Sequence, residues 1–253
     1  RISKMMIRIL PLILALLIHL PQLSFCSEFE INLGRSVSAT IFGKYEPIQN
    51  KSLIRYVNLV GQSIVSTSGR RDINFYFAIL DSPSIEAFAA PGGYIFITKG
   101  LLDIIQTEAE LAGILAHEIA HVNLKHVLNK VYSPEKTKQN FLSRLLNARN
   151  TSFQVALNEV SDKATQILLN EGLNENDEYE SDIAAIFYMQ NTGYNCQSYL
   201  NIISRLPKHS TISHSKTHPS MNKRIESIKV IFSNLDFSEG SQLAQRFNDH
   251  AKN

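Results

Sequence analysis

The sequence predicts a mainly helical α+β fold with a small sheet, and three observations support this. Apolar residues recur at helical spacing across residues 52–66. Thr107 precedes an acidic first turn and a long apolar segment, as at the start of a helix. Two short runs rich in β-branched and aromatic residues, Ile73–Leu80 and Tyr94–Thr98, predict strands.

The remaining elements follow from periodicity and from turn signals between the periodic segments. Pro91-Gly92-Gly93 predicts a turn that enters the second strand. In chain order, we expect helices over residues 52–66, 107–129, 155–169, 176–190, 197–206 and 221–232.

Length and charge limit the classes of function. The chain has 253 residues, which suits one domain with or without a targeting segment. Its 25 basic and 23 acidic residues give a net charge of +2. This balance gives no reason to expect nucleic acid as a partner.

The N-terminus resembles a secretory signal. Arg1, Lys4 and Arg8 precede a short apolar run over residues 9–18. We therefore predict a signal peptide over residues 1–26, followed by one domain over residues 27–253. We also predict that the protein is extracytoplasmic and lies in the periplasm. An uncleaved membrane anchor, or lipidation of Cys26, is the alternative. If Cys26 is retained, it could form a disulfide with Cys196 in an oxidising compartment.

The residues His117-Glu118-Ile119-Ala120-His121 carry the strongest chemical signal. Two histidines four residues apart on a helix project from one face and can bind one cation, and imidazole suits zinc. Glu118 lies about 100° round the helix from His117, where a carboxylate can take a proton from a metal-bound water. We expect one Zn²⁺ per chain.

A catalytic zinc needs a third protein ligand and an open position. The best candidate is Glu178, with Asp182 four residues later accepting a hydrogen bond from a ligand imidazole. Spacing alone leaves the choice among Glu175, Glu178, Glu180 and Asp182 open.

Several motifs, in order, resemble the HtpX/BepA-like gluzincin metallopeptidases, a group related to the CAAX prenyl endopeptidases. The HEIAHV run at 117–122 is followed by His126, and a strand-like segment over 87–102 precedes it. Residues 178–182 (EYESD) are similar to the E-x-x-A-D element of the family, with Ser181 where Ala is usual. Thr217-His218-Pro219 with Arg224 resembles a late family element.

This resemblance implies a gluzincin domain with Glu178 as third zinc ligand and Asp182 behind the ligands. It implies that His218 can occupy the open metal position at rest and that Arg224 lies near the site, as a gate or transition-state residue. It also implies that the edge strand of the sheet borders the active-site cleft and pairs with extended substrate. We assign that role to Tyr94, Ile95, Phe96, Ile97 and Thr98.

We therefore expect a zinc-dependent metalloendopeptidase that acts on unfolded or extended proteins, in envelope protein quality control by analogy with the family. Association with membrane or envelope assembly proteins is a further expectation. The alternative is a non-proteolytic, chaperone-like zinc protein. Glu118 argues against it, because a purely structural site has no need of that carboxylate.

Overall fold

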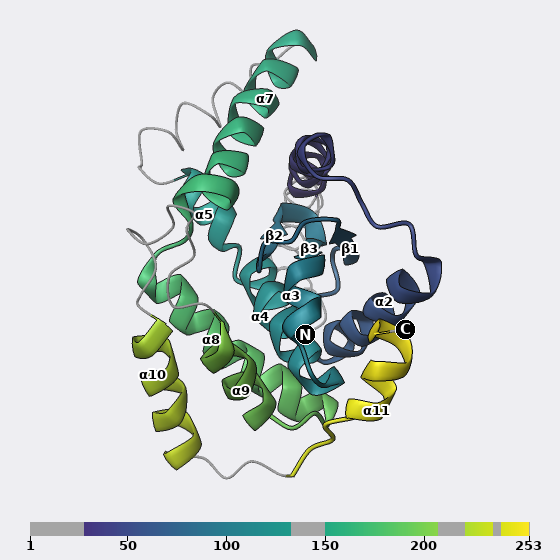
Figure 1. Cartoon of the computed structure of the whole chain (residues 1–253). Coiled ribbons are helices and arrows are strands. Elements are labelled where there is room, and N and C mark those ends of the chain that lie inside the picture. The colour runs from purple at the N-terminus through teal and green to yellow at the C-terminus, as the bar shows by residue number, and fades with distance from the viewer. Residues whose placement is uncertain (1–27, 133–149, 207–220, 235–238, 253) are drawn as a thin grey trace, which may run out of the picture.

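The computed structural model describes residues 28–132, 150–206, 221–234 and 239–252 (Figure 1). The predicted signal peptide (1–26) and the segment that carries His218 lie outside these ranges, so both remain predictions. Within the described ranges, no helix combines the length and apolarity that crossing a membrane requires.

Three short strands form one sheet in the order β1-β3-β2. Strand β1 (Tyr76–Leu80) pairs in parallel with β3 (Tyr94–Thr98), and β2 (Ala87–Ala90) pairs with β3 in antiparallel orientation. The two predicted strands are confirmed, although β1 begins three residues later than expected. Strand β2 was not separated from the strand-like segment over 87–102, because three of its four residues are alanine, which has low β-propensity.

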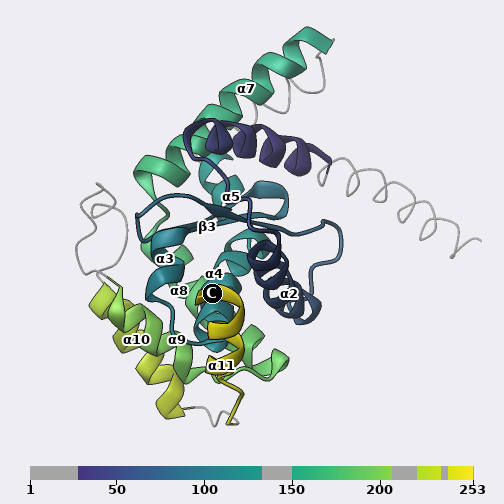
Figure 2. The same ribbon diagram turned by 45° about the vertical axis from the view of Figure 1, so that its right-hand side comes forward.

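The prediction that Tyr94–Thr98 is the edge strand is wrong. This strand, β3, has hydrogen-bonded neighbours on both sides, and its two faces are also covered. Ile95 and Ile97 join the core formed with α2 (Lys51–Thr67) and α4 (Glu108–Asn123), whereas Phe96 belongs to a second cluster, formed with helix 28–44. This helix lies across the other side of the sheet (Figure 2). Because side chains alternate between the two covered faces, four of the five residues of β3 are buried. Strand β2 is an edge strand of this sheet and contacts α4.

Helices surround this sheet (Figures 1 and 2). Besides helix 28–44, they are α2 (Lys51–Thr67), α3 (Lys99–Ile104), α4 (Glu108–Asn123), α5 (His126–Tyr132), α7 (Asn150–Gln166), α8 (Glu175–Thr192), α9 (Gln197–Arg205), α10 (Met221–Asn234) and α11 (Ala244–Phe247). Short 3₁₀ or π-helical turns occupy Pro91–Gly93, Ile167–Glu171 and Asn248–Lys252. Except for the segment 107–129, the predicted helical segments are therefore confirmed, and the fold is mainly helical with a small sheet.

One helix prediction needs correction. The segment 107–129 forms two helices, because α4 ends at Asn123 and Lys125 adopts a left-handed conformation with φ 59°. The new helix α5 begins at His126. The predicted start is confirmed: Thr107 caps α4, and its hydroxyl accepts a hydrogen bond from the backbone N–H of Glu110 at 3.2 Å.

Helix α4 is the buried centre of the domain, with every residue except Asn123 buried. Helix α8 packs along it, beginning at a capping box between Asn174 and Asp177 and ending at Gly193 with φ 83°. Because both helices have defined ends and a shared buried face, the residues of α8 are held at fixed heights against those of α4.

A C-terminal segment fixes the first turn of α4. The buried carboxylate of Glu108 accepts hydrogen bonds from the hydroxyls of Tyr56, at 2.9 Å, and Tyr194, at 2.6 Å, and it pairs with Arg246. Phe247 is fully buried beside them. This end of α4 lies at the opposite end of the helix from His121.

Candidate metal centre

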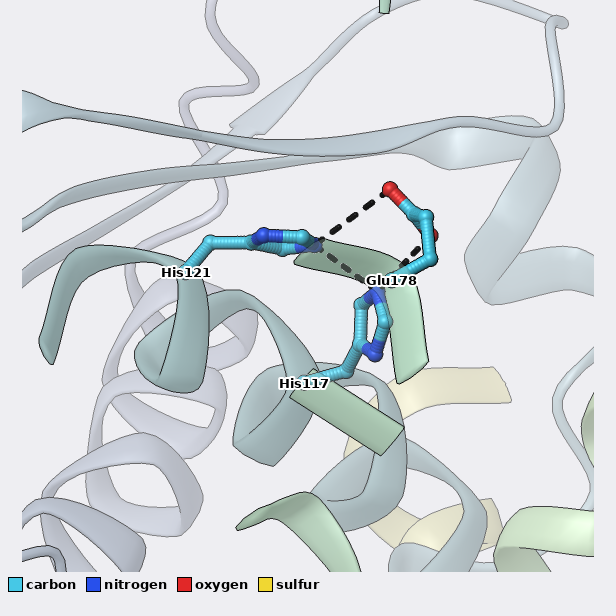
Figure 3. A group of neighbouring side chains, drawn as sticks. All are labelled: His117, His121 and Glu178. Atoms are coloured by element: carbon cyan, nitrogen blue, oxygen red, sulfur yellow. Dashed lines mark hydrogen bonds and ion pairs between the residues drawn. The ribbon is translucent and has the colours of Figure 1, made fainter. Parts of the chain in front are cut away.

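His117, His121 and Glu178 come together between α4 and α8, with their polar atoms pointing toward one another (Figure 3). His117 Nε2 lies 3.0 Å from His121 Nε2. The carboxylate oxygens of Glu178 lie 3.5 Å from His117 Nε2 and 3.6 Å from His121 Nε2. All three side chains are buried. Within the described ranges this is the one group of histidine, cysteine and acidic side chains arranged to hold a metal ion.

The spacing of these atoms fits zinc. Tetrahedral zinc with bonds of about 2.0–2.1 Å places neighbouring ligand atoms about 3.3 Å apart. The two imidazole nitrogens lie 3.0 Å apart, and each has one oxygen of the Glu178 carboxylate within 3.6 Å, so the three groups lie close to that spacing. Two imidazoles and one carboxylate are also ligands that zinc prefers, and three protein ligands leave a position open.

Glu118 faces the same space. A cavity of about 350 Å³ is lined by the three candidate ligands, by Glu118 and by residues of β2. Glu118 is 6% exposed, and burial raises the pKa of its carboxyl to about 7. A carboxyl with a pKa near neutrality can both take and return a proton at physiological pH.

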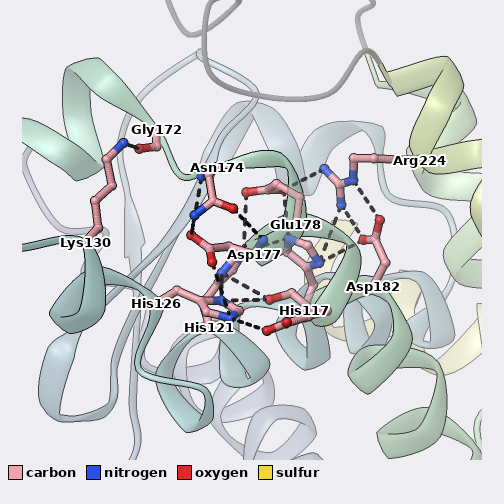
Figure 4. Close-up of polar contacts among 12 residues, drawn as sticks. His117, His121, His126, Lys130, Gly172, Asn174, Asp177, Glu178, Asp182 and Arg224 are labelled. Carbon is pink, nitrogen blue, oxygen red and sulfur yellow. Dashed lines mark hydrogen bonds and ion pairs between the residues drawn. The ribbon is translucent and has the colours of Figure 1, made fainter. Parts of the chain in front are cut away.

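Arg224 and Asp182 form a buried ion pair behind the ligands (Figure 4). Arg224 Nε donates to Asp182 Oδ2 at 2.9 Å, and Arg224 Nη1 lies 3.1 Å from Glu178 Oε2. Asp182 Oδ1 lies 3.0 Å from His117 Nδ1. The hydroxyl of Tyr199, from α9, donates to Asp182 at 2.6 Å and lies 2.9 Å from His117 Nδ1.

These contacts give the two histidines different electrostatic surroundings. Burial alone would lower the pKa of His117, but Asp182 and Glu178 outweigh it and raise that pKa to about 9. Burial and the neighbouring His117 lower the pKa of His121 well below its usual value, so its imidazole is neutral. The carboxylates of Asp182 and Glu178 therefore favour a positive charge at His117.

Some of the residues considered from sequence lie at the metal site, and others do not. Of the acidic candidates left open by spacing, Glu178 and Asp182 face His117, whereas Glu175 accepts from Tyr179 and Lys223 on the surface. Glu180 points to a different histidine, His126. His218 lies outside the described residues, so its proposed role remains a prediction.

Sequence reasoning missed Tyr199. Among the residues that the structure describes, it is the largest fully buried side chain, and its hydroxyl reaches both His117 and Asp182. A tyrosine in an amphipathic helix normally indicates only core packing, and no spacing relative to the HEIAH run marks it. The signal that could have suggested a polar role is the need of a buried hydroxyl for a partner.

Comparison with known proteins gives consistent results. The model of peptidase family M48 matches residues 51–231. The chain is 27% identical over 183 residues to the mitochondrial metalloendopeptidase OMA1 of Schizosaccharomyces pombe, covering 69% of this chain and 51% of that protein. It is 26% identical over 192 residues to the beta-barrel assembly-enhancing protease of Yersinia pestis, covering 72% and 38%.

The corresponding protease of Escherichia coli O157:H7 is 24% identical over 207 residues, which cover 78% of this chain and 42% of the relative. The chain thus spans about half, or less, of the length of these relatives. The matches confirm the family resemblance inferred from the ordered motifs.

Proposed function

The chain belongs to peptidase family M48, and we propose that it is a zinc-dependent metalloendopeptidase. One observation carries the proposal. Two imidazole nitrogens and one carboxylate lie at the mutual distances of a three-ligand zinc site, and the non-ligating Glu118 lines the same cavity.

In this proposal each side chain has a defined task. His117, His121 and Glu178 hold the metal, which when bound supplies a Lewis acid that polarises the peptide carbonyl and acidifies water. Glu118 takes the proton of the attacking water and returns it to the leaving nitrogen. Asp182 accepts a hydrogen bond from His117 Nδ1, and this hydrogen bond orients the ring so that its Nε2 faces the metal position.

Arg224 and Tyr199 hold this arrangement in place. Arg224 bridges the carboxylates of Glu178 and Asp182, so it fixes the ligand and its neighbour together. Its side chain also lines the cavity, where a guanidinium can stabilise an oxyanion that forms on the substrate. We therefore retain Arg224 as a proposed transition-state residue.

We propose that extended substrate pairs with β2 instead of β3. Ala87, Phe88 and Ala89 line the cavity, and β2 has a hydrogen-bonded neighbour on one side only within the described sheet. An edge strand binds an extended peptide mainly through backbone hydrogen bonds, which suits loose sequence preference. Unfolded or extended proteins are the substrates that fit this mode.

We further propose that these substrates are envelope proteins and that the protein acts in the periplasm, in association with envelope assembly proteins. The basic and apolar N-terminal segment supports the location. The names of the relatives from Yersinia pestis and Escherichia coli, which describe beta-barrel assembly, support the process.

Replacement of Glu118 by Gln tests the catalytic assignment. The variant should bind one zinc per chain but cleave an unfolded protein about 10²–10⁴-fold more slowly, because the proton acceptor is lost. Metal analysis and a casein-type cleavage assay measure both properties. Glu110→Gln is the matched control, since Glu110 is a buried glutamate of the same helix that does not line the cavity.

The alternative function is a zinc-binding, chaperone-like protein without protease activity. It would be favoured if zinc-loaded wild type cleaved nothing and His218→Ala did not release activity. Equal cleavage rates for wild type and Glu118→Gln would overturn the assignment of Glu118, and absence of bound zinc would overturn both functions.

A further inference from the structure

His126 lies directly behind the candidate ligand His121, on the side away from the cavity (Figure 4). It is 2% exposed, and its Nδ1 atom lies 2.9 Å from His121 Nδ1. The hydroxyl of Ser181 lies 3.1 Å from the same His121 atom and 3.3 Å from His126 Nδ1. His126 and Ser181 therefore both contact the ring nitrogen of His121 that does not face the other candidate ligands.

The direction of these hydrogen bonds follows from the metal site. His121 presents Nε2 to His117 and Glu178, so its metal-binding lone pair is on Nε2 and its proton is on Nδ1. That Nδ1–H must donate, and His126 Nδ1 is the nearest acceptor. His126 can accept there only when its own proton is on Nε2.

Acidic residues of α8 stabilise that tautomer of His126. His126 Nε2 lies 3.3 Å from Glu180 Oε2, which can accept its proton, and 4.0 Å from Asp177 Oδ1. Hydrogen bonds can therefore run in one direction, from His121 to His126 and from His126 to Glu180. The reverse direction would put the proton of His121 on Nε2, which would remove the lone pair that faces His117 and Glu178.

The break between α4 and α5 makes this contact possible. In a continuous helix, a residue five positions after His121 would lie about 140° round the axis, out of reach of its imidazole. Lys125 instead adopts a left-handed conformation with φ 59°, and α5 begins anew at His126. A non-glycine residue in this conformation costs about 1–2 kcal/mol, which the surrounding contacts must offset.

We propose that His126 is a positioning residue for the metal site: it accepts the Nδ1 proton of His121 and, held by Glu180, fixes the tautomer and ring orientation of that ligand. Ser181 supports the same ring through its hydroxyl. The proposal rests on the zinc site of the proposed function. It gives the two ligand histidines different supports, since His117 is held by the carboxylate of Asp182.

Zinc affinity, measured by competition with a chromophoric chelator, tests this role separately from catalysis. His126→Leu should bind zinc about 10–100-fold more weakly, because the acceptor is removed. His126→Asn should stay close to wild type, since its amide oxygen can occupy the position of Nδ1. His126→Gln, whose amide reaches the position of Nε2 instead, should behave like Leu. His250→Leu, an exposed histidine far from the site, is the control.

The comparison of Asn with Gln separates positioning from packing, because both amides are polar and the two variants differ mainly in where the acceptor lies. Equal affinities for these two variants, or wild-type affinity for His126→Leu, would overturn the proposal. If His126→Leu does not fold, the difference in zinc affinity between His126→Asn and His126→Gln still tests the proposal. Absence of zinc binding by wild type would overturn the proposed function together with this role, whereas the other outcomes concern His126 alone.

Discussion

Loss of the Asp182 charge should destabilise the protein even without metal. Asp182 is 1% exposed and pairs with Arg224, which is also buried. Removal of one partner of a buried ion pair costs about 3–5 kcal/mol, because the other charge is left without compensation. Glu178 still lies 3.1 Å from Arg224, so we expect Asp182→Asn to cost about 3 kcal/mol, at the lower end of that range.

Urea unfolding followed by circular dichroism, with a chelator present, measures this free energy of unfolding. For a chain of this size, about 3 kcal/mol corresponds to a melting temperature lower by about 6–12 °C. Asp103→Asn is the matched control, because Asp103 forms an exposed pair with Lys99 and should change stability by no more than about 1 kcal/mol. If both variants were equally stable, the buried pair would not contribute as argued.

Three further changes have defined expectations. Burial opposes ionisation of Glu108, but its hydrogen bonds outweigh burial and lower the pKa of the carboxyl. The free energy of unfolding of wild type should therefore exceed that of Glu108→Gln by its full amount above about pH 4.3, and this difference should shrink in acid. A difference that stayed constant from pH 3 to 7 would contradict this. Gly93→Ala should lower stability by at least about 2 kcal/mol, since its Cβ would lie 2.1 Å from the carbonyl oxygen of Asn74. Gly69→Ala, with the same φ of 90° and open space, should cost only about 1–2 kcal/mol by the same unfolding assay, and equal losses would refute the steric argument. Tyr199→Phe should weaken zinc binding about tenfold in chelator competition, and an unchanged affinity would show that its hydroxyl does not support the site.

Features that depend on local geometry could be predicted from the sequence alone. The contact between His117 and His121 follows from one turn of helix, and Thr107 defines where that helix begins. Helical periodicity likewise located α2, α8 and α9 to within about two residues. The choice of Glu178 as third ligand required the family resemblance, because neighbouring acids of α8 have similar spacing.

Contacts between side chains that are distant in the sequence depend on how the helices and strands pack. Its β-branched and aromatic residues predicted that Tyr94–Thr98 is a strand, but a central strand and an edge strand can share that composition. Pairing with both β1 and β2 placed it at the centre of the sheet. The left-handed residue Lys125 brought His126 behind His121. The packing of α9 against α4, and of α10 against α8 and α9, carried Tyr199 and Arg224 to Asp182. These contacts join residues from separate helices, and sequence spacing describes geometry only within one helix or strand.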